Sequence, residues 1–205
     1  MATKVRSHLT SKLSEDHLRE IGRVAAEWSA LEFAMLDSIA ICGEVPLVKT
    51  IMLCGPAAFA SWTDILLVVS ANKKHGHKYE PLRKLIGLLL KLLRLRNYMV
   101  HANWQHQDGV DSGLFASVVN PGPETAKGLG VPKRGQDIIL TVHWTVIQMR
   151  LVADLIAESR AVLHEIVDRK PSTSIAELVE QTQSYHSILA RIQSMLDRLP
   201  DPFQK

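Results

Sequence analysis

An arginine, a carboxamide and an imidazole lie close together at Arg96, Asn97 and His101, where a leucine-rich stretch comes to its end. A guanidinium keeps its charge in any environment and demands a carboxylate or phosphate partner when it is buried. An imidazole exchanges a proton near neutral pH. Asn97 and His101 are spaced to share one face of a helix. These residue types could hold an anion and move a proton beside it.

The arginine of this group is placed unusually for a solvated charge. On a helical wheel of about 100° per residue, Arg96 falls in line with Leu85, Leu89 and Leu92, the middle of the apolar arc. The other cations of the stretch form a separate, solvated stripe. Arg96 and His101 are about 140° apart on an ideal helix. They can converge if the helix ends or bends near Tyr98, or if the two act from different subunits.

Glu32 is a second charge that points toward the apolar side of its helix. It lies inside the apolar stripe of the first expected helix, four residues after Trp28 and three before Met35. An unpaired charge inside a bundle costs several kcal/mol. The simplest hypothesis is therefore that Glu32 and Arg96 meet. Such a pair would either fix only the register of two helices or hold the arginine of a functional site in place.

The elements that carry these residues are predicted to be helices. Apolar spacing, capping residues and Gly or Pro stops predict five of them. They cover about residues 15–43, 57–71, 79–99, 145–168 and 175–199. The stretch from Leu47 to Leu53 could belong to the second helix or form a separate turn. Thr145 is the expected cap of the fourth helix.

A small β-structure is predicted between the third and fourth helices. Leu114 to Val119 and Ile138 to Val142 are short and rich in β-branched residues, and glycines and prolines fill the segment between them. They predict a hairpin with a long mobile loop, an insertion at about residues 112–143. The expected fold is all-α, an up-and-down bundle of about five helices with this hairpin insertion. We expect residues 1–205 to form one domain, ending in the helix at about 175–199.

The stretch from Arg96 to His101, RNYMVH, resembles the signature of the HEPN superfamily. In that signature an arginine, commonly followed by a polar residue, stands a few residues before a histidine near the end of a long helix. Residues 21–32 are also similar to the first helix of bacterial HEPN-like proteins, and the helical resemblance covers about residues 15–168. One position departs from the pattern, because toxins that pair with a nucleotidyltransferase antitoxin usually carry a tyrosine where this chain has Asn103.

The resemblance implies a metal-independent endoribonuclease whose active site forms between two protomers. RNA carries its own nucleophile, the 2′-hydroxyl, so His101 would move protons and Arg96 would hold the developing charge. Asn97 would orient a phosphate oxygen or the imidazole, and Glu32 would support Arg96. The implied setting is a homodimeric toxin or defence effector that cleaves single-stranded RNA and is restrained by an antitoxin or regulatory protein.

Aromatic and basic residues near the motif are further candidates for RNA contacts. Tyr98 and Trp104 could stack on bases, although a role in the core or an interface is favoured for both. Lys127, Lys133 and Arg134 of the hairpin loop could attract phosphates, or they are simply solvated.

The composition excludes several other classes of protein. With 205 residues, 46% hydrophobic and 22% charged, the chain can bury one core without disulfide or metal staples. Its net charge of +3 is far below that of a chromatin protein. No apolar stretch reaches the roughly 20 residues of a membrane span, and no apolar signal region opens the chain. We expect a cytoplasmic protein with no membrane partner.

No cofactor or metal is expected. His75 and His77 have only Glu80 as a further nearby ligand, and nucleotide-binding or serine-hydrolase motifs do not occur. Two alternatives to the nuclease stay open. One is a HEPN-like module that binds RNA or a nucleotide, or regulates, without catalysis. The other is a helical interaction protein in which Arg96 and Glu32 form a purely structural pair.

Overall fold

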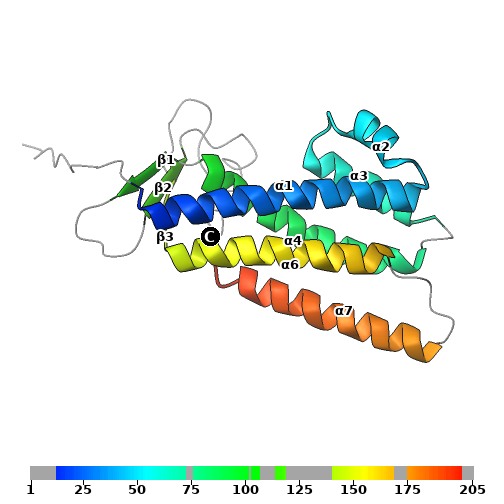
Figure 1. Ribbon diagram of the computed structural model, residues 1–205. Coiled ribbons are helices and arrows are strands. Elements are labelled where there is room, and N and C mark those ends of the chain that lie inside the picture. The colour runs from blue at the N-terminus through cyan, green and yellow to red at the C-terminus, as the bar shows by residue number, and fades with distance from the viewer. Residues whose placement is uncertain are drawn as a thin grey trace, which may run out of the picture.

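The computed structural model describes residues 13–72, 76–101, 103–106, 114–118, 140–168 and 175–199. Within these ranges the protein has six helices and a small antiparallel sheet (Figure 1). The expected all-α character is confirmed for the body of the molecule. The helices are α1 (Glu15–Gly43), α2 (Leu47–Cys54), α3 (Phe59–Ser70), α4 (Gly76–His101), α6 (Val146–Asp168) and α7 (Ile175–Leu196).

Local sequence signals explain where α1 and α6 begin. The Ser14 hydroxyl accepts a hydrogen bond from the His17 backbone N–H at 3.3 Å at the start of α1. At the start of α6, Thr145 Oγ1 accepts from the backbone N–H of Gln148 at 3.2 Å, and Gln148 Oε1 accepts from the backbone N–H of Thr145 at 2.9 Å. This reciprocal pair is a capping box. The prediction that Thr145 caps this helix is confirmed.

The end of α1 uses an unusual residue. Glu44 adopts a left-handed backbone with φ 54°, and the backbone N–H of Val45 donates to the carbonyl of Ala40 at 3.0 Å. A glycine is the usual residue at such a helix end. Gly43 is instead the last residue of α1, one position before the turn. The chain then reverses into α2, an eight-residue helix that was expected to be at most a turn or part of the next helix.

The long helices run along one axis, and the two with the most extensive contact, α1 and α6, are parallel (Figure 1). Glu20 pairs with Arg150, and Glu27 pairs with Arg160. The residue numbers therefore rise in the same direction along both helices. The expected simple up-and-down series therefore does not describe this pair. Charged groups line the contact between α1 and α6, and they fix how the two helices are aligned.

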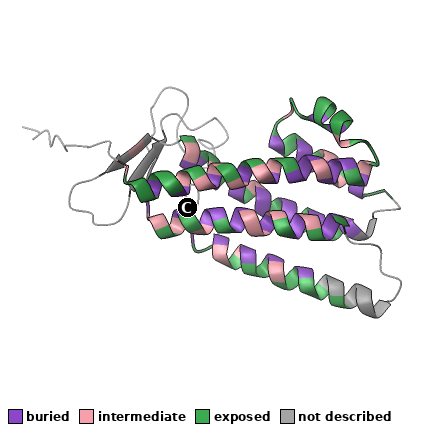
Figure 2. Cartoon of the chain, viewed as in Figure 1, coloured by how far each residue is buried: buried purple, intermediate pink, exposed green. Residues whose placement is uncertain are grey.

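α4 runs antiparallel to α6 and completes the core. The Lys78 ammonium at its start donates to the Val167 carbonyl near the end of α6, and Tyr98 near its end contacts Trp144 just before α6. The buried faces of α1, α4 and α6 turn toward one another (Figure 2). Fully buried large side chains include Trp28, Leu31 and Met35 of α1, Leu85, Leu89 and Leu92 of α4, and Met149 of α6. Burial of each such side chain contributes roughly 1.5–3 kcal/mol.

The sheet lies at the end of the bundle where α4 stops and α6 starts. Its strands are β1 (Asn103–His106), β2 (Leu114–Val118) and β3 (Leu140–Trp144), with β2 in the centre and antiparallel to both neighbours. The expected two-stranded hairpin insertion is not a separate unit, because β2 and β3 belong to a three-stranded sheet. The third strand is β1, which begins two residues after the end of α4. β3 ends two residues before α6 begins, so the sheet connects the two helices. β1 was missed because four residues give no alternating apolar pattern.

No helix in the described part of the chain is long and apolar enough to cross a lipid bilayer.

Candidate functional site

The last turns of α4 bring Arg96, Asn97 and His101 together. Nη1 of Arg96 donates a hydrogen bond to Oδ1 of Asn97 at 2.9 Å and lies 3.4 Å from Nε2 of His101. Asn97 and His101 are exposed, and Arg96 is half-buried. The three residues therefore form one cluster, open to solvent, at the end of α4. We call it the Arg96–His101 cluster.

Arg96 and His101 come together in neither of the two ways that were expected. α4 does not end near Tyr98 but continues to His101, and a second subunit is not needed to bring the groups together. The long arginine side chain spans the angular offset, because its guanidinium lies several bonds from the helix backbone. For Nε2 to accept a hydrogen bond from the guanidinium, the ring must be neutral with its proton on Nδ1.

The positive charge of this cluster is not neutralised by an acid of the described part of the chain. Arg96 forms no ion pair there, and its Nε is buried without a hydrogen-bond partner. Its partners are an amide and an imidazole, and neither is a carboxylate. Guanidinium groups bind carboxylates and phosphates more strongly than neutral acceptors, often through two parallel hydrogen bonds. The cluster therefore presents a half-buried cation, between two exposed side chains, that is suited to an anionic ligand.

The prediction that Glu32 and Arg96 meet is wrong. Glu32 is half-buried, and its Oε1 accepts a hydrogen bond from Nε1 of Trp28 at 2.8 Å, one turn earlier on the same helix. Trp28 is fully buried, so its N–H needs an acceptor inside the protein. The helical wheel gave the direction of Glu32 correctly but left out this nearer partner.

The two aromatic residues expected near the cluster have structural contacts. Tyr98 is 3% exposed, and its ring lies 6.5 Å from that of Trp144, centroid to centroid. Its ring is thus part of the core and is closed to a base. Trp104 is half-buried, and its Nε1 donates to the Met99 carbonyl at 2.9 Å, which ties β1 to the end of α4. The loop cations Lys127, Lys133 and Arg134 lie outside the described residues.

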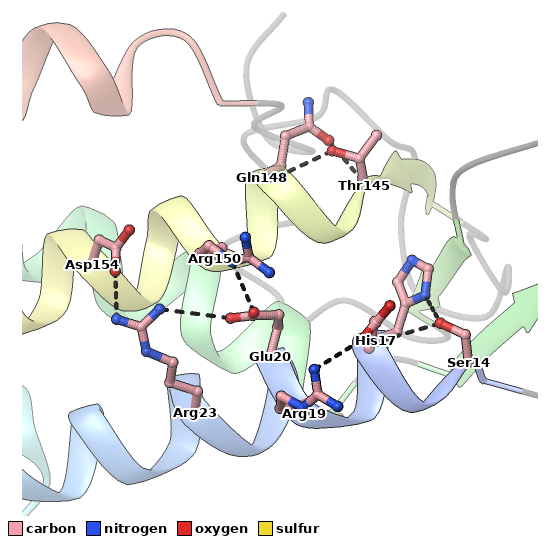
Figure 3. A network of polar contacts seen from close by, with 10 residues as sticks. Ser14, His17, Arg19, Glu20, Arg23, Thr145, Gln148, Arg150 and Asp154 are labelled. Atoms are coloured by element: carbon pink, nitrogen blue, oxygen red, sulfur yellow. Dashed lines mark hydrogen bonds and ion pairs between the residues drawn. The ribbon is translucent and has the colours of Figure 1, made fainter.

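A second polar cluster lies between the first turns of α1 and α6 (Figure 3). Glu20 is 4% exposed, and its Oε1 accepts a hydrogen bond from Nε of Arg150 at 2.9 Å. Nη1 of Arg23 lies 3.8 Å from Oε2 of Glu20, and Nη2 of Arg23 lies 2.5 Å from Oδ1 of Asp154. His17 at the start of α1 lies beside Ser14, with Nδ1 2.6 Å from the serine oxygen.

The sequence interpretation missed this second cluster. Its residues are about 130 positions apart along the chain, so no short-range spacing connects them. Glu27 pairs with Arg160 across the same contact at 3.3 Å. Each cation of the α1–α6 contact has a carboxylate beside it. The arrangement therefore aligns two helices and presents no free charge to a ligand.

The cysteine thiols do not add a nucleophile to the site. Cys42 and Cys54 are both free and buried. Burial raises the pKa of the Cys42 thiol, and the nearby Lys78 ammonium offsets part of that effect. A buried thiol with a raised pKa is a poor nucleophile, because the thiolate is the reactive form. Among the residues that the structure describes, no group of three or more acids, histidines or cysteines could hold a metal ion.

Comparisons with protein-family models, with curated proteins and with solved structures give no significant match.

Proposed function

We propose that this protein is a HEPN-like, metal-independent endoribonuclease that cleaves single-stranded RNA through its own 2′-hydroxyl. The observation that carries the proposal is the 3.4 Å approach of Arg96 Nη1 to His101 Nε2 at the solvent-exposed end of α4. A guanidinium without a carboxylate partner in the described part of the chain lies beside an imidazole there. These are the two groups that phosphodiester cleavage by an internal nucleophile requires.

The first step is the exchange of one acceptor for another at Arg96. A phosphate oxygen is a stronger acceptor than an imidazole nitrogen, so a bound phosphodiester replaces His101 as a partner of the guanidinium. This exchange frees Nε2 of His101. Asn97, already hydrogen-bonded to Nη1 of Arg96 at 2.9 Å, keeps the guanidinium oriented.

The free imidazole then acts first as a base and then as an acid. Nε2 of His101 takes the proton from the 2′-hydroxyl, and the 2′-oxygen forms a bond to the adjacent phosphorus. Arg96 stabilises the charge on the phosphorane oxygens. The bond from phosphorus to the 5′-oxygen breaks, and that oxygen receives the proton from the imidazolium. The products are a 2′,3′-cyclic phosphate and a 5′-hydroxyl end.

The proposal differs from the expected arrangement in two places. One chain is enough to supply both Arg96 and His101, so a site shared between two protomers is not needed to bring them together. Glu32 stabilises the packing of Trp28 rather than holding Arg96. We retain the proposed setting of a cytoplasmic toxin or defence effector under the control of an antitoxin or regulatory protein, which rests on the HEPN resemblance.

A second candidate function is an RNA- or nucleotide-binding module without catalysis. It is favoured by the contact that occupies Nε2 of His101 in this structure, since a histidine that stays bound to Arg96 cannot take a proton. In that case Arg96 and Asn97 would bind a phosphate and no bond would break.

Cleavage of a mixed single-stranded RNA pool in the presence of EDTA separates the two candidates. We expect the wild type to cleave and His101→Ala to be inactive. His186→Ala removes another exposed histidine, on α7, and should cleave like the wild type. RNA that is bound but never cleaved by the wild type would favour the binding module. Neither binding nor cleavage would refute both.

A further inference from the structure

The short helix α2 turns most of its apolar side chains outward. Val48, Met52 and Leu53 are 64%, 72% and 79% exposed. Thr50, a polar residue, points inward and is 3% exposed. A helix that only covers a core shows the opposite pattern, with its polar side in water. α2 accordingly stands out as mostly exposed in Figure 2.

These side chains belong to a group of exposed apolar residues on α2 and just before it, which we call the α2 face. It consists of Val45, Val48, Ile51, Met52 and Leu53, all classed as exposed. Together they leave on the order of 500 Å² of apolar side chain in water, which is near the upper end for the largest patch of a typical monomer. Each partner of a standard protein interface buries roughly 800 Å². The α2 face with a polar rim is large enough for such an interface.

No described residue covers the α2 face, since its side chains are exposed in this structure. The segments that join the bundle at the α2 end, residues 73–75 and 169–174, read KKH and RKPSTS and contain no large apolar residue. Residues 1–12 and 119–139 are neighbours in sequence of α1, β2 and β3, and the start of α1 and the sheet lie at the opposite end of the bundle (Figure 1). Their compositions are also dominated by polar residues, glycine and proline.

The charges around α2 do not favour a lipid surface. α2 has eight residues, and Lys49 is the single charged residue among them. Helices that lie in the membrane interface carry a strongly charged polar face, usually rich in lysine and arginine. An apolar surface without a charge pattern is best matched by another of the same kind. In a two-fold pair the same patch serves both partners, and Lys49 can extend its ammonium to the rim.

We infer that the α2 face is the contact surface between two copies of this chain in a symmetric dimer. α2 and the sheet lie at opposite ends of the bundle, and the Arg96–His101 cluster lies at the sheet end (Figure 1). The dimer therefore holds its two clusters far apart, and each works within one chain. This inference does not depend on whether the protein cleaves RNA.

Sedimentation equilibrium of the full chain tests the inference. The wild type should sediment at twice the chain mass of 22.9 kDa. Leu53→Lys should raise the dimer dissociation constant about tenfold or more, because it places a charge at the most exposed apolar residue of the face. Ile147→Lys is the matched control, since Ile147 is 76% exposed and starts α6 at the other end of the bundle. It should leave the dimer unchanged.

A cross-linking experiment covers the case in which Leu53→Lys does not fold. Met52→Cys should give a disulfide-linked dimer under mild oxidation, whereas Ile147→Cys should not. A wild type that is monomeric throughout the micromolar range would overturn the inference, as would a dimer that cross-links through Ile147→Cys instead. Flotation of a monomeric wild type with phosphatidylcholine–phosphatidylglycerol vesicles, lost in Leu53→Lys, would assign the face to lipid instead.

Discussion

At the contact between α1 and α6 every arginine lies beside a carboxylate, whereas at the end of α4 the neighbours of Arg96 are an amide and an imidazole. Both regions lie near the same end of the bundle and both are rich in charge. In the first, the charges satisfy one another and Glu20 is buried. In the second, the described part of the chain leaves a cation with no acid to neutralise it. The difference separates charges that align helices from charges that are free to bind a ligand.

The largest effect is expected from Arg96. Arg96→Ala should lower the rate of RNA cleavage about 10²–10³-fold, because the developing charge on the phosphorane loses its donor. The free energy of unfolding should change by less than about 1 kcal/mol, since no acid is left unpaired. Arg94→Ala on the exposed side of the same helix is the control. Single-turnover cleavage and urea titration measure the two quantities. A large loss of stability with little loss of rate would give Arg96 a structural role.

At the α1–α6 contact the expected effect is on stability. Glu20→Gln should lower the free energy of unfolding by about 1–3 kcal/mol, because a buried charge partner of Arg150 is lost. Glu80→Gln removes the acid of an exposed pair with Arg83 and should cost less than about 0.5 kcal/mol. Urea titration of both variants makes the comparison. Equal costs would mean that burial of Glu20 has no special importance.

Variants of Glu32 test whether this residue acts through Trp28 or through the charge of Arg96. Glu32→Ala should cost about 1–2 kcal/mol of stability, since the buried N–H of Trp28 loses its acceptor. Glu32→Gln keeps an oxygen acceptor and should cost much less. Thermal melts of the two variants distinguish the roles. If Glu32→Gln lowers stability as much as Glu32→Ala does, the charge of Glu32 is what stabilises the protein, and an interaction with a cation such as Arg96 would explain the result.

The smallest effect concerns the buried thiol at the end of α1. Burial raises the pKa of Cys42, so the folded state holds the thiol proton more tightly than the unfolded state does. Its contribution to stability is therefore complete below the unfolded pKa of about 8.5 and is lost as the pH rises through the higher folded pKa. Urea titrations at pH 7.5 and above pH 9 should show a fall of less than about 1 kcal/mol that Cys42→Ala removes. A fall of the same size in Cys42→Ala would assign the effect to another group.

Local signals in the sequence were sufficient for much of the fold and for part of the site. Thr145 caps the helix that its position predicts, and Ser14 caps α1 through a hydrogen bond of the same kind. The spacing of Arg96, Asn97 and His101 led to a cluster that the structure brings together. In each case the deciding contact lies within a few residues along the chain. A hydrogen bond of this range is encoded in the residue types and their spacing.

Features that depend on distant contacts were missed. The α1–α6 pairs join residues about 130 positions apart, and a helical wheel contains no information about the partner helix. The wheel also showed that Glu32 faces inward but could not rank Arg96 against the nearby indole of Trp28. α2 escaped prediction as a helix of its own, because apolar residues on both of its sides leave no clear periodicity.

Mass spectrometry of the ends left on a defined single-stranded RNA, cleaved in EDTA by the wild type and by His101→Ala, is the most direct test of the proposed chemistry. We predict a 2′,3′-cyclic phosphate on the upstream fragment and a 5′-hydroxyl on the downstream fragment, formed by the wild type alone. A 3′-hydroxyl with a 5′-phosphate, or undiminished cleavage by His101→Ala, would contradict a reaction carried by Arg96 and His101.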